Sequence, residues 1–191
     1  MGVTYIPRSR TYGGFKAETL VLPLSWGNMW DDAEACLAAG TLPIVPAYDT
    51  GVADDFHCDT QTNDGTKTDI WWTIIVTPST YFAATNLTLK VDGMYALGGD
   101  AVMVAATLDA EAFPYDSTNG DYSNTDICAT AAQDLATSYA TESFTLTGTT
   151  VTAGLSILIR LTSVIQITSA GGAGTGMNSF NFPRLEFTGK E

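Results

Sequence analysis

The sequence predicts an all-β fold, and three observations support that prediction. Only 15% of the 191 residues are charged, 10% are aromatic, and glycine and threonine are abundant, a composition typical of short β-branched strands joined by glycine turns. Residues 144–164 alternate apolar and polar side chains and carry one charge, on Arg160, which is the period of a half-buried strand. About eight such patterns and one long crossover are typical of an antiparallel jelly-roll β-sandwich.

The first residues differ from the rest of the chain. Residues 1–17 hold Arg8, Arg10 and Lys16 and no acid, and they show no apolar period, so we expect an extended N-terminal arm that orders on another surface. The chain is therefore divided into the arm, 1–17, and a jelly-roll domain, 18–191. The three basic side chains are the candidate partner-binding residues of the arm.

The first part of the domain contains strands, one short helix and a long connection. Residues 18–26 place leucines on one face, and a proline makes this an edge strand or a strand end. Residues 31–40 begin with an aspartate N-cap and end at a glycine, which predicts a short helix. A long connection follows over 41–68. Residues 69–78 are β-branched and aromatic on both faces, as expected for a central strand covered on both sides.

Two alternating runs, 86–97 and 101–113, are separated by Gly-Gly-Asp and predict a β-hairpin. In the second run we expect Val102, Val104 and Leu108 to share one face, together with the alanines between and after them.

The remaining segments complete the count of strands. Residues 114–139 interrupt the pattern, and a helical turn and a crossover to the opposite sheet stay open as alternatives. Strands are expected near 143–146 and over 155–162, and residues 164–169 extend or repeat that ladder. Residues 180–189 form the last predicted strand.

The net charge of −13 excludes some classes of partner. Three of the eight basic residues lie in the arm, so five face all 21 acids in the remainder. Such a body repels phosphate, and we expect no nucleic-acid binding outside the arm. No apolar run reaches the length of a membrane span and no signal peptide begins the sequence, so we expect no membrane partner and synthesis in the cytoplasm.

Reactive side chains are few, and we expect no enzyme activity, no metal site and no cofactor. Three widely spaced cysteines form no metal motif, and the single histidine lies in an acidic loop. Asp116, Asp121 and Asp126 lie in a loop that could bind calcium, although solvation of the loop is favoured. Asp109 and Glu111 lie on one strand face and could serve a hydrolase, but such pairs normally come from different strands.

The aromatic residues offer candidate contacts. Trp71 and Trp72 point to opposite sheet faces by strand parity, so at most one lies in the sandwich core. We therefore name Trp71, Trp72 and Tyr95 as candidate contacts for oligomer packing or for a glycan.

Three patterns carry a resemblance to a known group of proteins. They are "W…P-S-T-Y…N-L-T-L", "D-I-C-A-T-A-A-Q" and "A-G-…-I-R-L-T", spread over residues 69–168. Together with the chain length they resemble small jelly-roll structural proteins of tailed bacteriophages, of the capsid cement or decoration type. The arm, residues 1–17, matches no such pattern.

The resemblance implies a non-enzymatic decoration protein on the capsid exterior of a virion, made in the bacterial host cytoplasm. Its implied partners are the major capsid protein and further copies of itself, as a homotrimer. The alternative is a carbohydrate- or receptor-binding domain of a tail fibre or spike, which would use the exposed aromatic side chains.

Overall fold

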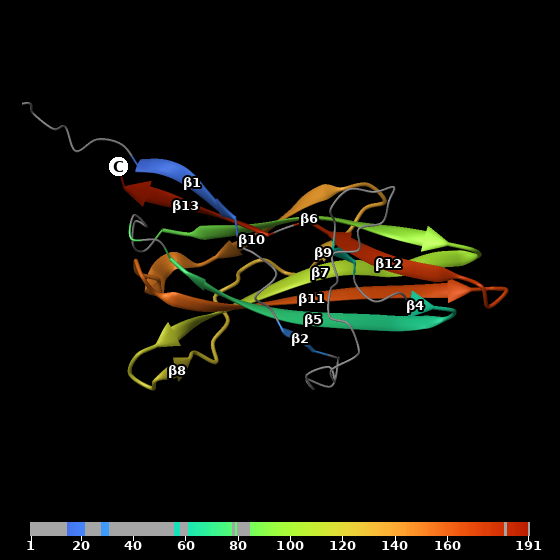
Figure 1. Cartoon of the computed structure of the whole chain (residues 1–191), viewed down its shortest axis with the longest axis horizontal. Helices are drawn as coiled ribbons and strands as arrows, with labels where there is room; N and C mark the ends of the chain where they lie inside the picture. Colours follow the sequence, from blue (N-terminus) through green and yellow to red (C-terminus); the bar gives the residue numbers. More distant parts are fainter. Residues whose placement is uncertain are drawn as a thin grey trace, which may run out of the picture.

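Two antiparallel β-sheets pack face to face in this protein, and the prediction of an antiparallel β-sandwich is confirmed (Figure 1). The computed structural model describes residues 15–21, 28–30, 56–57, 61–77, 79, 85–181 and 183–190. The short helix predicted over 31–40 and residues 1–14 of the predicted arm lie outside the described residues. A single 3-10 turn, Gly148–Thr150, is the helical segment of the described part.

The first layer, named the β6 sheet after its central strand, lies above the other layer in Figure 1. It contains β1 (Phe15–Val21), β3 (Phe56–His57), β4 (Gln61–Thr62), β6 (Leu87–Gly98), β10 (Ala140–Leu146), β12 (Thr175–Phe180) and β13 (Arg184–Lys190). Because β10 and β13 both pair with the first half of β6, they occupy its two edges.

The second layer, named the β11 sheet, contains the longest strands. It consists of β2 (Asn28–Trp30), β5 (Gly65–Val76), β7 (Ala101–Asp116), β8 (Asp121–Tyr122), β9 (Gln133–Asp134) and β11 (Ser156–Ser169). Strand β11 lies between β5 and β7 and pairs with both along almost its whole length.

The order of pairing is that of a jelly roll. Strand β1 pairs with β13, β5 with β11, β6 with β10 and β7 with β9. Early strands therefore pair with late strands in a nested order, as when one long hairpin is wrapped into two sheets. The predicted jelly-roll fold is confirmed at the level of strand pairing.

Alternating side chains of both sheets fill the space between the layers. The largest fully buried side chains are Leu87, Leu89, Leu108, Phe144, Leu146, Ile157, Ile159, Leu161, Ile165, Ile167 and Phe180. Asn178 on β12 links the two sheets through this core, because its amide donates to the Ser163 hydroxyl at 2.8 Å and to the Val164 carbonyl at 3.0 Å, both on β11. A strand period of two residues places these groups inward and leaves their neighbours outward.

The hairpin predicted from residues 86–97 and 101–113 is wrong as a pairing, although both strands are present. Strand β6 belongs to one sheet and β7 to the other, and the turn at Gly99 and Asp100 carries the chain between layers. Alternation identifies the inward face of a strand, but it does not say which sheet the strand joins.

The expected face of Val102 and Val104 is also wrong. The β7–β11 register shifts between Gln166 and Ile167, where β7 has one extra residue. Because of this β-bulge, the even-numbered side chains at the start of β7 point outward, whereas those beyond the bulge point inward. Val102 is 62% exposed, while Leu108 beyond the bulge is fully buried.

Three segments differ from their predicted bounds. Strand β11 continues through residues 164–169 as one strand, so these residues extend the ladder. The predicted last strand is divided into β12 and β13 around Asn181 and Pro183. Strand β1 begins at Phe15, so residues 15–17, assigned to the arm by the sequence, belong to a strand of the β6 sheet.

Gly99 is expected to be the least replaceable turn glycine. Its φ is +65°, and a Cβ there would lie 2.2 Å from the Ala173 carbonyl oxygen. Gly120 has a φ of +73° with no atom within 4 Å of its Cβ position. Gly120→Ala should therefore lower the free energy of unfolding by about 1–2 kcal/mol, the cost of placing a Cβ on a left-handed backbone. Gly99→Ala should cost about 1–3 kcal/mol more, because the backbone must also move. Urea unfolding of both variants measures the difference. Equal losses of unfolding free energy would contradict the close approach of the Gly99 turn to the Ala173 carbonyl.

Candidate functional site

The two outer faces of the sandwich have different chemistry. On the β6 sheet the outward side chains form ion pairs: Lys90 lies 2.8 Å from Glu186, and Arg184 donates two hydrogen bonds to Asp92, one of them 2.9 Å long. The Thr141 hydroxyl also donates to Asp92, at 2.5 Å. We call Lys90, Asp92, Arg184 and Glu186 the ion-paired face.

The environment of Asp92 favours its charged form. The hydrogen bonds from Arg184 are the largest cause, and they hold the pKa of this carboxyl below its ordinary value against the opposing effect of partial burial. The same interaction raises the pKa of Arg184. A surface of paired charges is already satisfied in water and gains little from a partner.

The outer face of the β11 sheet is mostly apolar over one half of its length. Ile74 and Val76 on β5 are each 54% exposed, and Tyr115 on β7 is 38% exposed. Half-buried Trp72, Phe113 and Leu158 lie between and beside them in the sheet. We call these six residues the apolar face.

Strand register places these side chains in adjacent rows. Leu158 on β11 lies opposite Ile74 on one side and Phe113 on the other. Two residues along, Arg160 lies opposite Trp72 and Glu111 in the same way. Successive rows on one face are about 7 Å apart, so the apolar row lies directly beside the row that contains the charges.

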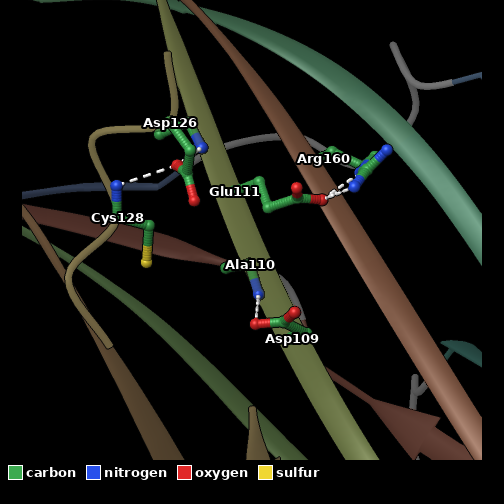
Figure 2. Close-up of polar contacts among 7 residues, drawn as sticks. Asp109, Ala110, Glu111, Asp126, Cys128 and Arg160 are labelled. Carbon is green, nitrogen blue, oxygen red and sulfur yellow. Dashed lines mark hydrogen bonds and ion pairs between the residues drawn. The ribbon is translucent and has the colours of Figure 1, made fainter. Parts of the chain in front are cut away.

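The second row is held by contacts that run across three strands. Arg160 on β11 forms an ion pair with Glu111 on β7, and Figure 2 shows the two side chains pointing toward one another. The Arg160 guanidinium also lies 5.4 Å from the Trp72 ring centroid, within the range of a cation–π contact. The Trp72 and Phe113 rings are 6.2 Å apart and tilted by 35°. These contacts fix the polar end of the apolar face.

The structure places the predicted aromatic contacts in different environments. Trp72 belongs to the apolar face. Tyr95 is partly buried against the core cluster, so it does not join Trp72 on one surface. Trp71 pairs with Leu161 and Met29 in the backbone of β5, and its side chain lies outside the described part.

The predicted arm residues are mostly outside the described part of the chain. Arg8 and Arg10 lie there, whereas Lys16 stands on β1 opposite Gly189 of β13. A partner-binding role for these residues stays a prediction.

The carboxylates of the predicted calcium loop accept separate hydrogen bonds near the edge of β7. Asp116 accepts from Thr118 and Asn119, and Asp121 accepts from the Tyr122 backbone. Asp126 accepts from the backbones of Ala112 and Cys128, and Figure 2 shows the bond from Cys128. Within the described residues no three histidine, cysteine, aspartate or glutamate side chains are grouped for a metal ion.

The other reactive groups are also engaged. Glu111 pairs with Arg160, while Asp109 accepts a hydrogen bond from the Ala110 backbone at 2.9 Å. Burial, with a smaller contribution from nearby carboxylates, raises the pKa of the Cys128 thiol and keeps it protonated at neutral pH.

The described part contains no helix long and apolar enough to cross a membrane.

The prediction that residues 69–78 are covered on both sides is wrong for the end of β5. Its inward side chains are buried, but Ile74 and Val76 are exposed. The sequence contained a sign of this exposed apolar surface, because residues 69–78 are apolar on both faces. In an antiparallel sheet of a two-layer sandwich, the outer face of such a strand has no second layer to cover it. Phe113, Tyr115 and Leu158 were missed because neighbours on a face are set by register between distant strands.

Comparisons with known proteins give fold-level likeness alone. No family model matches the chain, and no curated protein matches it. A solved structure of TmCBM61 in complex with beta-1,4-galactotriose is 9% identical, with a TM-score of 0.45, over 85% of this chain and 88% of that one. The CBM22-1–GH10 modules of Clostridium thermocellum endo-1,4-beta-D-xylanase 10B, complexed with xylohexaose, are 11% identical, with a TM-score of 0.36, over 72% of this chain and 26% of that one.

The Asp92–Arg184 pair should make stability depend on acidic pH. The pKa of Asp92 is lower in the folded chain than its ordinary value of 3.8, so the pair stabilises the fold above that pH and loses its contribution as pH falls through the folded value. Between pH 6 and pH 2, wild type should lose up to about 1 kcal/mol more unfolding free energy than Asp92→Asn, a small amount because the pair is partly exposed.

Urea titrations at several pH values measure this difference. Arg184→Gln should reduce the pH dependence in the same way, and the double variant should add nothing further. Identical pH profiles for wild type and Asp92→Asn would contradict the contribution assigned to the pair.

Proposed function

We propose that this chain is a non-enzymatic structural protein of a virion, a decoration protein that binds the outer shell of a capsid and stabilises contacts between major capsid proteins. This proposal rests on the difference in chemistry between the two outer faces of the sandwich. One face is ion-paired, whereas the other exposes contiguous apolar side chains. Monomeric proteins rarely expose large apolar patches, and those that are present commonly mark contact sites.

The chemistry of the apolar face supports adhesion to protein. Fully burying an isoleucine or valine side chain stabilises a complex by about 1.5–3 kcal/mol. Ile74 and Val76 are already partly covered, so each contributes a fraction of this, and the gain comes from the whole face. The backbone of the paired strands is already ordered, so binding at this face costs side-chain entropy alone, and that cost is smaller for aliphatic side chains than for long flexible ones.

The engaged state of the reactive groups supports a non-enzymatic role. In the described part, Glu111 is held by Arg160, and the Cys128 thiol is half-buried with a raised pKa. The resemblance of residues 69–168 to phage jelly-roll proteins supports the virion assignment, and the fold is the one that it implies. A homotrimer on the capsid exterior is part of the proposal.

Particle binding tests the role and the face together. Stripped phage particles are mixed with purified chain and separated on a density gradient, and bound chain is located by electron microscopy. Wild type should sediment with the particles and lie over the interfaces between capsid subunits. Ile74→Asp with Val76→Asp should reduce the bound fraction at least tenfold, because two charges would have to be buried.

The matched control is Ser143→Asp, which places a charge on the exposed side of the β6 sheet opposite Lys90. It should bind as wild type does. Density on the tail, or no binding by a folded wild-type chain, would reject the decoration role.

A carbohydrate-binding role is the second candidate, favoured by one observation. Trp72, Phe113 and Tyr115 lie on one sheet face beside the carboxylates of Asp109 and Glu111. Aromatic rings beside hydrogen-bonding groups can bind sugar rings. Arg160 lies close to the Trp72 ring, however, which disfavours sugar stacking there.

A glycan array with wild type and Trp72→Ala separates the two functions. The decoration proposal predicts no binding above background for either chain. A glycan bound by wild type and lost in Trp72→Ala would establish the second candidate instead.

A further inference from the structure

The two edges of the β11 sheet are covered to different extents. Along β7, the backbone amides of Ser123, Ile127 and Leu135 donate to the strand, so the following segment covers that edge. Along β5, strand β2 pairs with residues 70–72 and ends there. Within the described part of the chain no strand pairs with the outer edge of β5 beyond residue 72. An uncovered edge of this kind is a template for a further strand.

The free backbone groups belong to Ile74 and Val76. Thr77 exchanges backbone hydrogen bonds with Leu155 and Gly154 on the β11 side, each 2.9 Å long. Backbone groups of successive residues in a strand point to opposite edges, so the odd-numbered residues of β5 face β11 and the even-numbered ones face outward. The N–H and C=O groups of Ile74 and Val76 are therefore directed to the uncovered edge.

The residues along this edge favour pairing with another strand. Residues 73–77 read Thr-Ile-Ile-Val-Thr, which gives five β-branched side chains with no charge and no proline. Proteins that prevent pairing at an edge commonly place lysine or proline there. Ile74 and Val76 are also each 54% exposed. A strand added here would thus cover apolar side chains as well as backbone groups.

A second copy of the chain has the complementary strand. In an antiparallel pair centred on Ile75, Ile74 of one copy lies opposite Val76 of the other, and each such pair exchanges two hydrogen bonds. The pair occurs twice about the twofold axis, so four hydrogen bonds use every free group at this edge in both copies. A shift of the register meets Trp72, already paired with β2, in one direction and Pro78, which has no N–H, in the other.

We infer that two copies of this chain pair antiparallel through residues 73–77 of β5, about a twofold axis at Ile75. The axis is perpendicular to the sheet, so Ile74 and Val76 of both copies meet on the same side and the two apolar faces become one continuous surface. The inference deepens the proposed function and rests on it for the role of that joined surface. A twofold contact cannot close a trimer, so it joins copies of neighbouring trimers.

Sedimentation equilibrium of the full chain over a concentration series tests the pairing. The mass of the smallest wild-type species should double as concentration rises, and added salt should strengthen this step, because each copy carries a net charge of −13. Val76→Pro removes one outward N–H from each copy, and proline is tolerated at a strand edge. The variant should pair at least about tenfold more weakly, because the symmetry removes two hydrogen bonds.

Val76→Thr is the matched control. It keeps the backbone N–H and the β-branched shape, so it should pair within about twofold of wild type. Circular dichroism checks that both variants are folded.

Hydrogen exchange, followed by NMR, gives a second measurement on the unaltered chain. The amides of Ile74 and Val76 should exchange rapidly in dilute solution and become protected at concentrations where the chain pairs. The amide of Ile159 on β11, which is paired within the single chain, should be protected in both states.

Three results would overturn the inference. They are a single mass at every concentration, pairing of Val76→Pro at wild-type strength, and unchanged exchange of the Ile74 and Val76 amides in the paired species. None of them bears on the decoration role, which particle binding tests. A chain that pairs through β5 and never binds particles would support the inference and reject the decoration role.

Discussion

The pairing of β11 with β5 on one edge and β7 on the other determines both surfaces of the β11 sheet. Twelve residues of β11 pair with β5 and thirteen with β7, so its register is fixed along the whole strand. The buried row of Ile157, Ile159 and Leu161 makes any other register costly, because a slip of one residue would turn these side chains to water. The same constraint places Leu158 and Arg160 outward, each between defined neighbours.

The exposed chemistry is therefore a consequence of how the core is packed. Once the odd-numbered residues of β11 are buried, the aliphatic Leu158 must join Ile74 and Phe113 on the outside. The β6 sheet obeys the same alternation, but its outward positions carry Lys90, Asp92 and their partners. Two sheets that share one apolar core thus present one ion-paired outer surface and one outer surface that gains from being covered.

Much of the fold was predictable from the sequence, because alternation reports directly on which side chains are buried. The inward residues of β6 and the continuous strand of β11 follow from a period of two. Three features did not follow from that period. The turn at Gly99 passes between sheets, the bulge near Val104 reverses a face, and the partners of Leu158 come from strands far away in the sequence. Of the candidate site, parity separates Trp72, Ile74 and Val76 from the buried side chains of β5, whereas their neighbours Phe113 and Leu158 on other strands could not be identified.

Hydroxyl-radical footprinting of the chain, free in dilute solution and assembled on particles, tests the central claim most directly. The account predicts that Leu158, Phe113 and Ile74 become protected on assembly, because the apolar face is the surface that is covered. The side chains around Lys90 and Asp92 should stay equally reactive in both states. Protection confined to the ion-paired face, or equal reactivity of the apolar face in both states, would contradict it.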